Sequence, residues 1–188
     1  MGNFYTNYTV YGQSQQAVIA ALKGRSAYVT PVQHGCVVVF DEESEGQNEV
    51  VVTALADHLS GFLMCPVLAL INHDDDILWY QLLINGEVID EYDSCPEYFD
   101  ETAEPSDPVG GDAHKLCRAF ESSNVTEVER VLRISSLDDD GYAFEIERHT
   151  DLVKALGITT YGVGMGFSYI EAGELPEGLT KTELVRVP

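Results

Sequence analysis

The hydrophobic pattern of the first 73 residues switches between strand-like and helix-like spacing. Strand patterns are rich in aromatic and β-branched residues, and the two helical patterns begin at Ser14 and Asn48, which are good N-cap residues. The order is strand, helix, strand, strand, helix, strand, at residues 3–11, 14–24, 26–32, 36–43, 48–61 and 67–73. This βαββαβ order is that of a ferredoxin-like domain. Pro31 lacks an N–H donor, which predicts that the second strand lies at the sheet edge.

A hairpin is predicted directly after this unit. Asn85 and Gly86 separate two strand-like runs, 77–84 and 87–94, and Asn-Gly is a strong signal for a two-residue turn. The hairpin would lengthen the sheet. The predicted fold class is therefore α+β: a ferredoxin-like βαββαβ sheet extended by a hairpin, with a C-terminal helical part.

The second half of the chain is predicted to be mainly helical. Prolines, glycines and acids fill 96–111, which is typical of a surface loop. Helical patterns follow at 112–123, 125–134 and 148–158, and the last 30 residues mix strand pieces with turns that could return to pack on the first domain. These boundaries predict three parts: a ferredoxin-like domain (1–95), an acidic Pro/Gly loop (96–111), and a helix-rich part that packs on the sheet (112–188).

The composition excludes several classes of function. Ten Lys and Arg against 32 Asp and Glu give a net charge of −22, which opposes binding to nucleic acids and to anionic lipid surfaces. The chain shows neither a signal-peptide pattern nor a long apolar run, and its four cysteines are widely spaced. We therefore expect a soluble, cytoplasmic protein without a membrane segment, whose cysteines are reduced and mostly buried.

The charge is very unevenly placed along the sequence. Residues 26–114 hold 19 Asp and Glu and no Lys or Arg. One interpretation is a docking surface for a basic protein partner, and the other is an acidic surface that serves only solubility or a salty environment. For the first interpretation we predict six partner-binding residues, in the turn after 67–73 and in the second hairpin strand: Asp74, Asp75, Asp76, Asp90, Glu91 and Asp93. The turn acids also fit the oxygen ligands of Ca²⁺ or Mg²⁺, but Asp and Asn are ordinary turn formers, so a polar turn is the preferred account of them.

A second acidic motif resembles a calcium-binding loop. Asp138, Asp140 and Glu147 have nearly the spacing of an EF-hand, but Ser136 and Ala143 depart from its pattern. The alternative is a turn that leads into a strand over 142–147. Ca²⁺ is the only cofactor this pattern suggests. No motif for nucleophilic catalysis is present, so we assign no catalytic residue and favour a non-enzymatic protein.

Three stretches resemble a family of bacterial proteins without an established activity. They are NHDDDILWYQLLINGEVIDEYDS (72–94), ERHTDLVKALGI (147–158) and AGELPEG (172–178). The resemblance implies a bacterial cytoplasmic setting and supplies no catalytic residue. The small acidic α+β layout is also similar in style to immunity proteins of polymorphic toxins. The sequence thus predicts an acidic, immunity-like binding protein that engages a basic protein, with a Ca²⁺-binding protein as the alternative.

Overall fold

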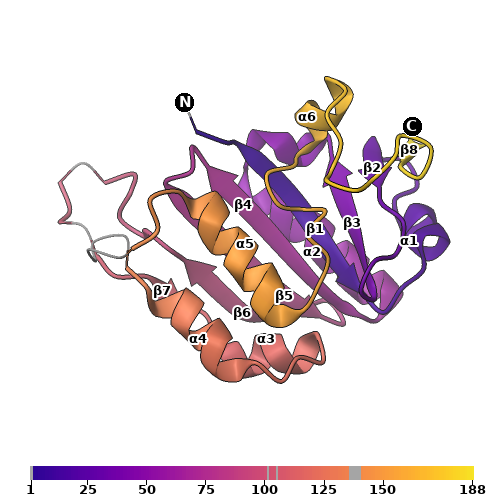
Figure 1. Ribbon diagram of the computed structural model, residues 1–188. Helices are drawn as coiled ribbons and strands as arrows, with labels where there is room; N and C mark the ends of the chain where they lie inside the picture. Colours follow the sequence, from indigo (N-terminus) through magenta and orange to yellow (C-terminus); the bar gives the residue numbers. More distant parts are fainter. Residues whose placement is uncertain (1, 101, 105, 136–140) are drawn as a thin grey trace.

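The computed structural model describes residues 2–100, 102–104, 106–135 and 141–188. The fold is mixed α+β, with one antiparallel sheet between two layers of helices (Figure 1). The strands are β1 (Tyr5–Tyr11), β2 (Ala27–Val29), β3 (Cys36–Asp41), β4 (Pro66–His73), β5 (Ile77–Ile84), β6 (Glu87–Asp93), β7 (Val109–Gly110) and β8 (Val185–Val187). The helices are α1 (Gln15–Ala21), α2 (Glu49–Leu63), α3 (Ala113–Ala119), α4 (Val125–Arg133), α5 (Glu145–Leu156), α6 (Phe167–Glu171) and the short 3₁₀ helix η1 (Glu43–Gly46).

The eight strands of the described chain lie in the order β7-β6-β5-β4-β1-β3-β2-β8. The predicted hairpin is confirmed: β5 and β6 pair around Asn85 and Gly86, which both have positive φ angles. The prediction that the second strand forms the sheet edge is wrong, because β8 returns from the C-terminus and pairs with β2. Pro31 lies beyond the three paired residues of β2, so its missing N–H does not interrupt that ladder.

Helices cover both faces of the sheet. α1 and α2 pack on one face with Val10, Val39 and Val67, and α3, α4 and α5 pack on the other with Leu70 and Tyr80. Figure 1 shows α4 and α5 in front of the sheet and α2 behind it. A third cluster joins α6 to β3. Because side chains alternate between faces along a strand, each strand serves both layers.

The helices predicted at 48–61, 112–123, 125–134 and 148–158 are confirmed as α2 to α5. The strand alternative over 142–147 is wrong, because α5 begins at Glu145. The Glu147 carboxylate accepts the Phe144 N–H at 3.4 Å, and Glu145 pairs with Arg148 one turn later, which favours a helix. In the described part of the chain, every helix is too short or too polar to cross a lipid bilayer.

Two short strands come from segments that the sequence did not assign to the sheet. β7 forms at the end of the predicted loop 96–111 and pairs with β6, and β8 belongs to the predicted helical part. The return of the C-terminal segment to the sheet is thereby confirmed. The division of the chain at residues 95 and 111 stays a prediction.

Candidate functional site

Two of the six predicted partner-binding residues are buried, and their carboxylates accept hydrogen bonds from other parts of the fold. Asp75 is 6% exposed, and its Oδ2 accepts the backbone N–H of Asn3 at 3.0 Å and the side-chain amide at 2.8 Å. Asp90 is 9% exposed, and its Oδ2 accepts the Tyr80 hydroxyl at 2.8 Å and the Asp112 N–H at 2.9 Å. These two carboxylates hold the N-terminal segment and the start of α3 in place.

The other turn acids, Asp74 and Asp76, lie closer to solvent. Asp74 is half-buried, and its Oδ1 accepts the Gly2 N–H at 2.7 Å. Asp76 is exposed, and its Oδ2 accepts the Tyr98 hydroxyl at 3.0 Å, which raises the pKa of that phenol. Both carboxylates accept hydrogen bonds from neutral groups. Their negative charges therefore remain at the end of the β4–β5 hairpin.

The acids of β6 divide between the two faces of the sheet. Asp90 points toward α3, whereas Glu91 and Asp93 share the opposite face, on the side of α2, because side chains alternate along the strand. Glu91 is exposed and accepts the side-chain amide of Gln81 at 2.5 Å. Asp93 is half-buried and accepts the Cys95 N–H at 2.9 Å. Only one of the three predicted partner-binding acids on β6 therefore faces the α3 layer.

Glu91 and Asp93 border a groove between α2 and β6, which we call the acidic groove. It consists of two adjoining hollows of about 440 Å³ and about 370 Å³ that share Glu49, the first residue of α2. Its acids are Glu49, Asp57, Glu91 and Asp93, and its partly exposed apolar residues are Val50, Trp79, Val88 and Val109. The groove exists because α2 reaches only part of β5 and β6, and this side of β6 stays open to solvent.

Glu49 and Asp93, two carboxylates of the acidic groove, repel one another. The pKa of Asp93 is raised, first by burial and then by the nearby charges of Glu49 and Glu97. In the described residues, the ion pairs use acids outside the groove: Asp41, Glu43, Asp112, Glu127, Glu129, Glu145 and Asp151. No described basic side chain therefore neutralises the groove within ion-pair distance.

The groove also exposes apolar surface, formed by residues that are not among the predicted site residues. Val50 on α2 is 78% exposed, and Val88 on β6 and Val109 on β7 are exposed as well. Trp79 lies half-buried on the floor of the groove. An apolar floor between acidic walls is a surface for an amphipathic, positively charged ligand.

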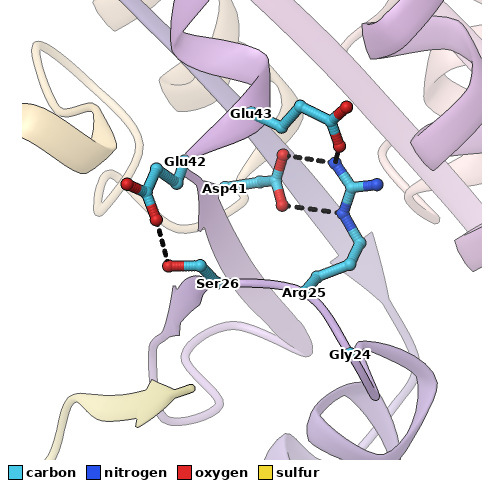
Figure 2. A pocket seen from close by; sticks show the side chains of 6 residues that line it. All are labelled: Gly24, Arg25, Ser26, Asp41, Glu42 and Glu43. Atoms are coloured by element: carbon cyan, nitrogen blue, oxygen red, sulfur yellow. Dashed lines mark hydrogen bonds and ion pairs between the residues drawn. The ribbon is translucent and has the colours of Figure 1, made fainter.

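A second pocket contains an arginine, but its charge is already neutralised. Figure 2 shows Arg25 between Asp41 and Glu43, in a pocket of about 370 Å³. The guanidinium bonds both oxygens of Asp41, at 2.8 and 2.6 Å, and lies 3.0 Å from Glu43, while Ser26 donates to Glu42. Because Asp41 is buried, this cluster ties the end of β3 to the loop before β2. We interpret it as structural.

In the described residues, side chains that could bind a metal ion are dispersed, and the buried thiols have raised pKa values. Within the described ranges, no group of three or more His, Cys, Asp or Glu side chains could hold a metal ion. Asp138 and Asp140 lie outside the described residues, and Glu147 caps α5, so calcium binding there stays a prediction. All four cysteines are free, and burial raises the pKa of Cys36 and Cys65 to about 11, which makes their thiols poor nucleophiles.

Comparisons with protein-family models, with curated proteins and with solved structures found no match for this chain. Any assignment of function therefore comes from the chemistry of the surface itself. The acidic groove combines shape, charge and apolar area at one place.

Proposed function

We propose that this protein is a non-enzymatic binding protein that engages a basic partner through the acidic groove. The observation that carries the proposal is the gathering of Glu49, Asp57, Glu91 and Asp93 around exposed apolar side chains, with no described cation paired to them. Unpaired like charges at this density cost folding stability, and a bound cation-rich partner would offset that cost. An acidic surface kept only for solubility would not need an apolar floor.

The shape of the groove favours a basic amphipathic helix as the bound segment. On this face, α1 and α2 form the helical layer, and the sheet continues past α2 to β6 and β7. A partner helix laid beside α2 would extend that layer, with its apolar stripe on Trp79 and Val109. Lys and Arg on both flanks of the stripe would face Glu49 and Asp57 on one wall and Glu91 on the other.

We also infer that residues 5–73 form a ferredoxin-like unit, as the sequence pattern predicts. Two features support this inference: the strand order β4-β1-β3-β2, and the position of α1 and α2 on one face of those strands. In this interpretation, β5 and β6 are an addition to the unit, and the acidic groove lies at the junction between the two.

A model peptide tests the proposed function, with Trp79, the only tryptophan, as reporter. We expect a helix of about 18 residues, with Leu on one face and Lys on the other, to bind and to shift Trp79 emission to the blue. Binding measured by calorimetry should weaken about tenfold or more between about 50 and about 500 mM salt. A peptide with Glu in place of Lys should not bind.

Matched charge reversals locate the binding. Glu49→Lys with Glu91→Lys should weaken peptide binding about tenfold or more, because both side chains face the bound helix. Glu174→Lys with Glu177→Lys changes the net charge equally at exposed positions between α6 and β8, outside the groove, and should change peptide binding less than about twofold. Equal weakening by the two pairs would mean that only net charge matters, and the groove would have no specific role.

A further inference from the structure

Two positively charged side chains of this acidic protein share one pocket. The ion pairs of the described residues use Arg25, Lys115, Arg130, Arg133 and Arg148. Lys181 and Arg186 belong to no ion pair in that part of the chain, yet both line a pocket of about 350 Å³ between β2, α6 and the segment that leads to β8. Figure 1 shows this segment in yellow, at the sheet edge opposite β6 and β7.

The Arg186 guanidinium is held in a fixed position. It lies 4.9 Å from the ring centre of Tyr28 and 5.0 Å from that of Phe167, and it donates to the Ser26 hydroxyl at 2.7 Å and to the Val187 carbonyl at 2.5 Å. A guanidinium held by stacking and hydrogen bonds loses little conformational freedom when it binds an anion. The exposed Lys181 can adjust to the same ligand.

The remaining walls of the pocket define what kind of anion would fit. Tyr28, Ile170 and Leu184 supply apolar surface for an organic body, and the volume is within the range of small-molecule sites. Glu171 also lines the pocket, and its carboxylate accepts the Tyr28 hydroxyl at 2.5 Å. Two cations and one carboxylate leave an excess of one positive charge. That excess suits a singly charged group better than a doubly charged phosphate.

We propose that this pocket binds a small carboxylate with an aromatic or aliphatic body, whose carboxylate group forms ion pairs with Lys181 and Arg186. The apolar body would lie against Ile170 and Leu184. This site is separate from the acidic groove, and the proposal does not depend on the peptide-binding function.

Titrations of the full ¹⁵N-labelled chain with three small molecules test this proposal by NMR. 3-Phenylpropionate should shift the backbone amides of Tyr28 and of the pocket residues within 170–186 in a saturable way. Phenethylamine, which has a similar body and the opposite charge, should leave them unchanged, and phenyl phosphate should bind more weakly than the carboxylate. Phosphate binding as tight as carboxylate binding would overturn the assignment, as would amine binding or shifts located elsewhere.

Substitution of the exposed lysine gives the matching control. Lys181→Glu should weaken 3-phenylpropionate binding about tenfold or more, because it reverses the charge excess of the pocket. Lys23→Glu carries the same charge change at an exposed site after α1 and should stay within about twofold of the wild type. Unchanged binding in Lys181→Glu, with its unfolding midpoint also unchanged, would contradict the proposed site.

Discussion

Replacing Arg148 with methionine is expected to lower the free energy of unfolding at pH 7 by about 3–5 kcal/mol. Arg148 is fully buried on α5, and its guanidinium bonds both oxygens of Glu145, at 2.7 and 3.1 Å. It also donates to the Val131 carbonyl at 2.7 Å and stacks 4.6 Å from the ring centre of Tyr142. Without the guanidinium, the Glu145 charge and the α4 carbonyl would stay buried without these partners. Urea unfolding followed by Trp79 fluorescence measures the loss.

Two further variants separate the buried pair from helix charge in general. Arg130→Met removes an exposed arginine that pairs with Glu127 on α4, and such surface pairs contribute less than about 1 kcal/mol. The double variant Glu145→Leu with Arg148→Met removes both buried charges and should be more stable than Arg148→Met alone. If Arg148→Met cost no more than Arg130→Met, the buried pair would not be holding α5 on the sheet.

The sequence was a good guide to the strands and helices because their signals are local. Ser14, Asn48 and the Asn85-Gly86 turn each act within a few residues of themselves, and the corresponding elements are all present. The return of β8 to pair with β2 depends on contacts across more than 150 residues, which no local pattern encodes. The start of α5 was missed for a related reason, because 142–147 alternates like a strand, whereas Glu145 and Arg148 pair only when the segment is helical.

The candidate site was only partly predictable. Charge asymmetry pointed to β6, and Glu91 and Asp93 do border the acidic groove. The sequence does not predict that Asp75 and Asp90 accept hydrogen bonds from Asn3 and Tyr80, because these contacts form only when the chain folds. Glu49 and Asp57 lie on α2, and only the packing of that helix beside β6 brings them to the same groove. Val50 is a local sequence signal for exposed apolar surface at the groove, because it interrupts the polar face of an amphipathic helix.

One buried histidine is expected to contribute a loss of stability when the pH falls mildly below neutral. His149 on α5 is 2% exposed, and its Nδ1 lies 2.9 Å from the Tyr5 hydroxyl. Burial lowers the pKa of His149 from 6.5 to about 3. Below pH 6.5 the imidazole is therefore protonated in the unfolded chain but stays neutral in the folded chain. Between those two pH values, unfolding is favoured by about 1.4 kcal/mol for each pH unit, or about 2 kcal/mol by about pH 5. That pH is still above the isoelectric point of about 4.2.

The variant His149→Gln isolates this effect, because glutamine can form a hydrogen bond with the Tyr5 hydroxyl but does not titrate. The difference in unfolding free energy between the wild type and the variant, measured in urea from about pH 7.5 to about pH 5, should be constant above pH 6.5 and then shift by about 2 kcal/mol in favour of the variant. Burial raises the pKa of Glu145, which acts in the opposite direction, but this contribution is common to both proteins and cancels in the difference. Tyr5→Phe keeps the histidine buried and should keep the wild-type pH dependence. Parallel stability curves for wild type and His149→Gln would mean that His149 gains its proton without unfolding, and that the α5 layer is open to water at this point.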